Sequence, residues 1–202
     1  MMTMSIAVLA MTAMPLAAGS SPLIPSVDAT REMALCVLKK DRANAVAIAA
    51  SEPATAAFDK AARRIEPVLS NCLKPEMQSL TIRINDLRGV FAELLLKEGD
   101  NAALARARTL PAVAPRRITL GKYSEVNDSA LFRCVAEADP LQAATLVQAM
   151  PGSADEGAAF RGLSVALQGC VPANAAMHVK PYQVRLLIAA SLYGRLAALP
   201  GA

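Results

Sequence analysis

Apolar residues recur at helical spacing along most of the chain. Within 79–98 they stand three or four positions apart, and this period places them on one face of an α-helix. Comparable patterns and breaks predict helices over 30–40, 42–51, 55–73, 79–98, 128–138, 140–150, 153–171 and 180–199. No stretch alternates apolar and polar residues as a half-buried strand does. The pattern therefore predicts an all-α protein.

Residues typical of turns and helix caps interrupt the helical pattern, and the N-cap aspartate Asp41 recurs 98 residues later as Asp139. Asp41 and Asp139 stand at the N-cap position ahead of a helix, and Pro140 takes the first helical position behind Asp139. Each N-cap follows directly on the preceding helix, which predicts a tight corner between the two helices. Gly99 is placed to end the helix over 79–98, because glycine tolerates the left-handed conformation common at helix ends.

The two halves of the chain repeat each other. A shift of 98 residues aligns 36–72 with 134–170 without a gap, and ten of the 37 pairs are identical. Beyond the second cysteine, a shift of 97 aligns Arg88 with Arg185. We therefore expect a duplicated four-helix unit. Its copies are predicted over 28–99 and 124–199, in a pseudo-twofold or short solenoid-like bundle that meets through the last helix of each unit. The identical pairs are Cys36/Cys134, Val37/Val135, Asp41/Asp139, Ala45/Ala143, Pro53/Pro151, Ala56/Ala154, Ala61/Ala159, Arg63/Arg161, Leu69/Leu167 and Cys72/Cys170.

The four cysteines follow the repeat. Cys36 and Cys72 are 36 residues apart, and so are Cys134 and Cys170. Because each unit carries one pair, we expect each to close its own disulfide, which in the chain-entropy model contributes about 3–4 kcal/mol per bridge. A zinc site and catalytic thiols are the alternatives. Zinc favours closely spaced ligand pairs, which this sequence lacks, and a catalytic thiol rarely needs an equally spaced copy.

Composition and the N-terminal segment bear on location. The chain has 202 residues, of which 54% are hydrophobic, 19% charged and 3% aromatic, so it has enough apolar residues for a core. Residues 1–18 are apolar and small, and the first charged residue is Asp28. This predicts a signal peptide over 1–18 followed by an extension over 19–27, although the leader lacks the usual basic start. The alternative is a buried N-terminal helix of a cytosolic protein. Disulfides favour export, so we expect a periplasmic or secreted bacterial protein without an integral membrane span after leader removal.

A basic segment over 100–123 joins the units. Its first residues are predicted to be helical, and Pro111 and Pro115 make the rest extended. It could contact an anionic surface such as lipid headgroups, a polyanion or an acidic protein, or it could be a solvated connector. Nucleic acid is not expected, because the net charge is only +4 and no aromatic residues interleave with the arginines. Its candidate contact residues are Arg106, Arg108, Arg116, Arg117 and Lys122.

Few residues offer catalytic chemistry. His178 is the only histidine and has no histidine at the equivalent place in the first unit, so we interpret it as a loop residue. No nucleophile, metal-binding or phosphate-loop motif occurs, and we expect no catalytic residues, metal or cofactor. Arg88 and Arg185 recur on otherwise apolar helices. They are either paired ligands for an anion or partner near the symmetry axis, or arginines whose heads bond helix ends or carboxylates such as Glu93.

The C-x35-C unit followed by Leu-Arg-Gly-Val-Phe-Ala-Glu-Leu-Leu at 87–95 resembles small, uncharacterised exported bacterial proteins of helical, paired-cysteine type. The resemblance covers most of 30–199 and implies location and fold, because no activity is attached to that group. The function expected from these features is a soluble, non-enzymatic binding or scaffold protein of the bacterial cell envelope, holding an unknown protein or small ligand between its units. The alternatives are a peripheral binder of anionic surfaces through 106–122, and an enzyme whose site no motif reveals.

Overall fold

The computed structural model describes residues 24–74, 83–119, 128–172, 175 and 179–200. This part of the chain contains helices and connecting segments and no strand, so the all-α prediction is confirmed. The predicted leader and His178 lie outside the described residues. No helix in the described ranges is long and apolar enough to cross a membrane. The helices are α1 (Ile24–Lys40), α2 (Arg42–Ala50), α3 (Ala56–Ser70), α4 (Ile84–Arg108), α5 (Asp128–Ala138), α6 (Pro140–Gln148), α7 (Ala154–Gly162), α8 (Ser164–Cys170) and α9 (Pro181–Ala197).

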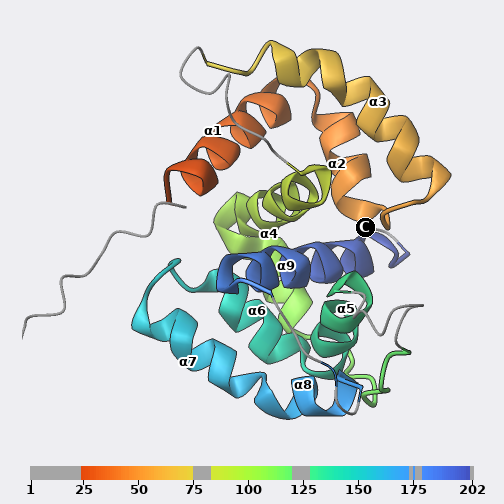
Figure 1. Ribbon diagram of the computed structural model, residues 1–202, viewed down its shortest axis with the longest axis vertical. Coiled ribbons are helices and arrows are strands. Elements are labelled where there is room, and N and C mark those ends of the chain that lie inside the picture. The colour runs from red at the N-terminus through yellow and green to blue at the C-terminus, as the bar shows by residue number, and fades with distance from the viewer. Residues whose placement is uncertain (1–23, 75–82, 120–127, 173–174, 176–178, 201–202) are drawn as a thin grey trace, which may run out of the picture.

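The helices form two related halves around a central pair. Figure 1 shows α4 and α9 crossing in the middle, with α1, α2 and α3 on one side and α5 to α8 on the other. Half a turn in the plane of the picture exchanges the two outer groups. The contacts between the halves are reciprocal, because α4 packs on α6 while α9 packs on α2. This is the packing of a pseudo-twofold pair rather than that of a solenoid, in which each repeat only follows the last.

The central helices approach closely at Gly89 of α4 and Leu186 of α9. A Cβ atom placed on Gly89 would lie 2.5 Å from the Leu186 Cβ and 2.8 Å from its carbonyl oxygen. The 97-residue shift relates these two positions, so the pseudo-twofold axis passes through their contact. The helices that carry the apolar stripes thus meet as predicted.

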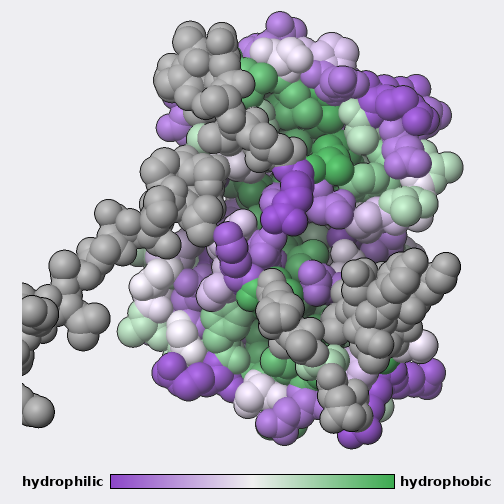
Figure 2. Space-filling model, viewed as in Figure 1, coloured by the Kyte–Doolittle hydropathy of each residue, from purple (hydrophilic) through white to green (hydrophobic). Residues whose placement is uncertain are grey.

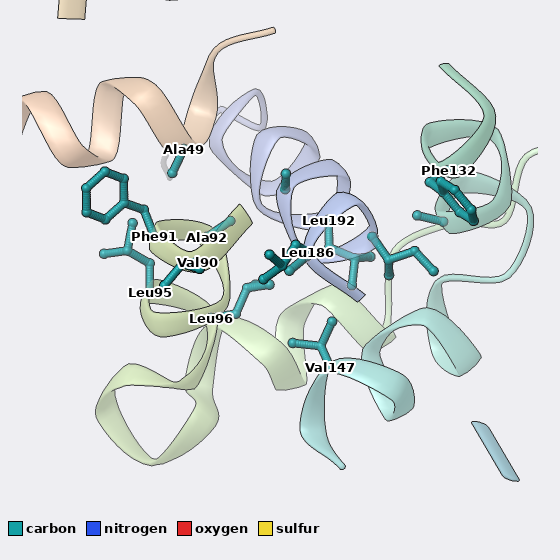
Figure 3. Packing of buried hydrophobic residues seen from close by; sticks show 14 of the residues in the cluster. Ala49, Val90, Phe91, Ala92, Leu95, Leu96, Phe132, Val147, Leu186 and Leu192 are labelled. Atoms are coloured by element: carbon teal, nitrogen blue, oxygen red, sulfur yellow. The ribbon is translucent and has the colours of Figure 1, made fainter. Parts of the chain in front are cut away.

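Both halves contribute to one hydrophobic core. The buried residues form a single cluster that includes side chains from α1 through α9. The sequence left open whether the units share a core, and the structure settles that they do. Figure 3 shows part of this cluster, in which α4 contributes Val90, Phe91, Ala92, Leu95 and Leu96, α9 contributes Leu186 and Leu192, and Ala49, Phe132 and Val147 come from α2, α5 and α6.

Each half is closed by its own disulfide, as predicted. Cys36 of α1 is bonded to Cys72, which follows α3, and their Cα atoms are 5.8 Å apart. Cys134 of α5 is bonded to Cys170 of α8, with Cα atoms 5.9 Å apart. The predicted corners are also present, because Asp41 and Asp139 accept hydrogen bonds from backbone N–H groups in the first turns of α2 and α6.

Three predicted helices differ in the structure. The helix expected over 30–40 begins at Ile24, within the extension predicted over 19–27. The helix expected over 153–171 is divided at Leu163 into α7 and α8, directly after Gly162, a weak helix former. The helix expected over 79–98 begins at Ile84 among the described residues and continues, after a break, to Arg108. Gly99 opens this break with φ 57°, as its predicted role at a helix end requires, and the two residues that follow are also left-handed.

The segment after α4 is docked on the second half. The Val113 N–H donates to the Glu137 carbonyl at 2.8 Å, and the Ile118 N–H donates to the Cys170 carbonyl at 3.0 Å. The Arg195 guanidinium donates to the Pro111 carbonyl. The connector is exposed along 111–117, and its backbone is nevertheless held by hydrogen bonds to helices far away in sequence.

Replacing Gly89 with alanine should destabilise the fold. The added methyl group would meet a backbone carbonyl and a Cβ, neither of which can rotate away, so we expect unfolding free energy to fall by about 1–3 kcal/mol. The matched control is Gly157→Ala, because the nearest atom there is the end of the Arg161 side chain at 3.6 Å. The control should be neutral or stabilising. Equal stability of the two variants in urea denaturation would contradict the close crossing.

Replacing Gly169 with alanine should loosen the docked segment. A Cβ there would lie 2.7 Å from the Pro115 ring, which cannot swing aside without moving the backbone. We expect tryptic cleavage after Arg116 and Arg117 to become several-fold faster in Gly169→Ala, because cleavage of a docked segment requires local opening. Gly157→Ala serves as the control, and unchanged cleavage in Gly169→Ala would show that Pro115 does not hold the segment.

Candidate functional site

Arg185 of α9 is buried under the end of α6. Its side chain is 3% exposed. The guanidinium donates to the carbonyls of Leu146, Val147 and Ala149 at 2.8, 2.6 and 2.7 Å. These carbonyls lie at the C-terminal end of α6, where a helix carries partial negative charge and lacks its own donors. Arg185 therefore caps a helix from the inside of the protein.

Two carboxylates complete the surroundings of Arg185. Glu156, at the start of α7, accepts from the guanidinium at 3.0 Å, and Glu93 of α4 accepts from it at 3.0 Å. Glu156 also accepts from the Gly152 backbone N–H at 2.7 Å. Glu93 belongs to the first half and Arg185 to the second, so this ion pair joins the two halves beside the crossing of α4 and α9.

Glu93 is surrounded by cations. Besides Arg185, Lys97 lies 2.9 Å and Arg31 3.4 Å from its Oε1 atom. Burial alone would raise the pKa of Glu93, but the hydrogen bonds and charges of Arg185 and Lys97 outweigh burial and hold this pKa below its ordinary value. The pKa of Lys97 is lowered by burial, against the opposing effect of Glu93. Glu93 is therefore ionised at neutral pH, and its role is to hold the surrounding cationic side chains in place.

Arg88 occupies the equivalent place in the first half with fewer partners. Its side chain is 2% exposed, and among the described residues its guanidinium donates to Glu52 at 3.3 Å. Arg133 of α5 lies 3.8 Å from the same Glu52 oxygen, so Glu52 also links the two halves. Burial lowers the pKa of Arg88, and Glu52 partly offsets this effect. Ala190 stands where the repeat would need a second Glu93, which explains why Arg88 lacks a buried carboxylate.

Arg88 and Arg185 thus lie close to the symmetry axis. Their guanidinium groups bond acceptors within the protein, in agreement with the interpretation that they bond helix ends or carboxylates. Sequence reasoning named Glu93 but missed Glu52 and Glu156 as their partners. The repeat gave no signal for these two glutamates, because Met150 aligns with Glu52 and Phe58 aligns with Glu156.

The arginines of the connecting segment have different surroundings. Arg106, Arg116 and Arg117 are exposed, and no ion pair to them occurs among the described residues. Arg108 is half-buried and donates to the Gln148 side chain of α6. Lys122 lies outside the described residues. The candidate contact residues of this segment therefore stay accessible, with the exception of Arg108.

The surface carries an apolar groove in the first half, which we call the α1–α4 groove. It lies between the end of α1, the start of α2 and the middle of α4, and encloses about 330 Å³. Figure 2 shows that hydrophobic residues reach the surface in both halves on the face drawn there. The α1–α4 groove has an apolar floor and a mostly basic rim, formed by Leu35, Leu38, Leu94 and Leu95, and by Lys39, Arg42, Lys97 and Glu98.

A second hollow lies in the other half, between α6 and α7. It encloses about 460 Å³ and is lined by polar and small side chains together with Met150, which is exposed. Asp155 is the only charged group in this lining. The α1–α4 groove therefore offers the stronger combination of apolar contact and charge.

Comparison of this chain with protein-family models, with curated proteins and with solved structures found no match. Within the described ranges, no three His, Cys, Asp or Glu side chains are grouped as a metal site requires.

Glu93→Gln should destabilise the protein most at neutral pH. A carboxylate with a lowered pKa contributes stability above its unfolded-state pKa of about 4.3, and loses this contribution as pH falls through the lower pKa of the folded state. Removing the charge leaves Arg185 with the more exposed Glu156 as its remaining carboxylate partner, and we expect a loss of about 3 kcal/mol at pH 7. The difference from wild type should shrink below about pH 4.

The control is Glu98→Gln, because the pKa of Glu98 is lowered by its hydrogen bond to Arg42 but this pair is half-exposed. Such a pair contributes little. Urea denaturation between pH 3 and 7 measures both variants. A pH-independent difference for Glu93→Gln, or an equally large effect of Glu98→Gln, would contradict a stabilising role of the buried ion pair.

Proposed function

We propose that this chain is an exported, non-enzymatic binding protein of the bacterial cell envelope that holds a partner in the α1–α4 groove. The observation that carries the proposal is the groove itself. In its floor, Leu35 is 43% exposed and Leu38 and Leu94 are half-buried, above the buried Leu95. Exposed apolar surface rimmed by charge is typical of a place where another molecule binds.

Export is supported by independent features. Two disulfides within a chain of this size are typical of oxidising compartments, since cytosolic thiols are kept reduced. The apolar segment over 1–18 has the length and small-residue end of a signal peptide. The resemblance to exported helical proteins with paired cysteines points to the same location.

The groove differs from the place first expected for a partner. A site between the two units was expected, but α4 and α9 meet there in direct contact at Gly89 and Leu186. The buried arginines next to this contact bond protein acceptors and stabilise the junction. Binding is therefore assigned to the surface of the first half, where Leu35 is exposed beside a charged rim.

A second candidate function is contact with an anionic surface through the connecting segment. The exposed side chains of Arg106, Arg116 and Arg117 favour it. Because the backbone of this segment is docked on the second half, these charges stand on a fixed support rather than on a loose tether.

One experiment separates these functions. The full-length chain, expressed with a C-terminal affinity tag, should be found oxidised in the periplasmic fraction and should capture an envelope component. Capture should be lost in Leu35→Asp and retained in Leu141→Asp, a control at a leucine of α6 that is 52% exposed and lies outside the groove.

Three results would contradict the proposal. Reduced protein confined to the cytoplasm would contradict export. Capture that survives Leu35→Asp would exclude the groove as the binding surface. Capture that instead disappears in the double variant Arg116→Ala and Arg117→Ala would assign binding to the connecting segment.

A further inference from the structure

In the second half, the connecting segment lies at the position that corresponds to the α1–α4 groove of the first half. Under the repeat, Lys39 and Glu98 of the α1–α4 groove correspond to Glu137 and Arg195. Both of these residues contact the connecting segment. The Glu137 carbonyl accepts from the Val113 N–H at 2.8 Å, and the Arg195 guanidinium donates to the Pro111 carbonyl. The chain thus places its own extended peptide, Pro111–Val113, at the groove position of the second half.

The first half offers matching groups without that peptide. α1 ends at Lys40, so the Lys39 carbonyl points beyond the last turn of the helix, as the Glu137 carbonyl does in α5. Among the described residues, no donor outside α1 reaches the Lys39 carbonyl. Glu98 stands at the position of Arg195, and Arg42 on the same rim donates to both of its carboxylate oxygens, so an ion pair replaces the single cation of the other half.

The α1–α4 groove and the equivalent position in the second half differ in how apolar the floor is and in the charge of the rim. Leu35, Leu38 and Leu94 of the open groove correspond to Arg133, Ala136 and Ser191, so the open groove is more apolar. At the position of Glu137, beneath an arginine-rich segment, the first half carries a lysine. On the rim of the open groove, Arg42 is paired with Glu98 and Lys97 with the buried Glu93. Lys39 supplies the excess positive charge, so the complement of the groove is apolar and acidic.

Building on the proposed function, we propose that the α1–α4 groove binds a short extended peptide of a partner protein, apolar, proline-containing and flanked by acidic residues. Its backbone binds in the way that the second half binds Pro111–Val113, with one peptide N–H on the Lys39 carbonyl. Its apolar side chains lie on the leucine floor, whereas those of Pro111–Val113 are exposed. Proline suits such a peptide, because it is already extended before binding.

Labelled peptides and the full oxidised chain test this proposal. The probe is Thr-Leu-Pro-Ala-Val-Ala-Pro-Glu-Glu, which is the sequence of residues 109–117 with glutamate in place of both final arginines. The comparison peptide keeps the two arginines. In fluorescence anisotropy, the acidic peptide should bind at least ~10-fold more tightly than the basic one, because like charges at the rim repel.

Variants locate the binding and its charge preference. Leu35→Asp should weaken binding of the acidic peptide at least ~10-fold, through loss of apolar contact. Lys39→Glu should weaken the acidic peptide and strengthen the basic one. Leu141→Asp, outside the groove, should leave both affinities unchanged.

Several outcomes would overturn the inference. Equal binding of the two peptides would remove the acidic preference, and binding insensitive to Leu35→Asp would remove the groove. Binding that appears only after deletion of residues 1–23 would identify the chain's own N-terminal segment as the occupant. Failure of the peptides, with envelope capture still dependent on Leu35, would refute the peptide class and leave the proposed function standing. Peptide binding without any envelope capture would refute the proposed envelope role and leave the peptide inference standing.

Discussion

The fold depends on the contact between Gly89 and Leu186. Because Gly89 has no side chain, the backbones of α4 and α9 approach until a leucine Cβ fills the space that another residue would occupy. This approach buries the apolar faces of both helices against each other and against α2 and α6. It also brings Arg185 within reach of both Glu93 and the end of α6. A single interhelical distance thus governs the core, the buried ion pair and the relation between the halves.

The two halves have diverged where they meet. At the crossing, glycine faces leucine. Arg185 is paired with the buried Glu93 of the other half, whereas the position equivalent to Glu93 for Arg88 is occupied by Ala190. The two groove positions differ in the same sense, since one is covered by the connecting segment and the other is open. Identical halves would present the same surface twice, whereas this asymmetry leaves the α1–α4 groove without the connecting segment, and we propose that a partner binds there.

The sequence predicted the features that depend on local pattern or on the repeat. Helical periodicity located most helices, Asp41 and Asp139 located the corners, and the equal spacing of the cysteines gave the disulfide pairing. The partners of the buried arginines were harder to predict. Arg185 meets Glu93 across 92 residues, and only the packing of α4 on α9 brings them together. Docking of the connecting segment depends on Gly169, whose role becomes visible only when Pro115 lies against it. The groove, which lies where the end of α1 and the start of α2 meet the middle of α4, has no sequence motif.

The central claim is that both halves fold as one unit around α4 and α9. Hydrogen exchange of the oxidised chain, followed in both halves across a urea series, tests it most directly. The account predicts that the core amides of α2 and α6 lose protection at the same urea concentration, in one transition. Loss of protection in one half while the other stays folded would show two independent domains and contradict the shared core.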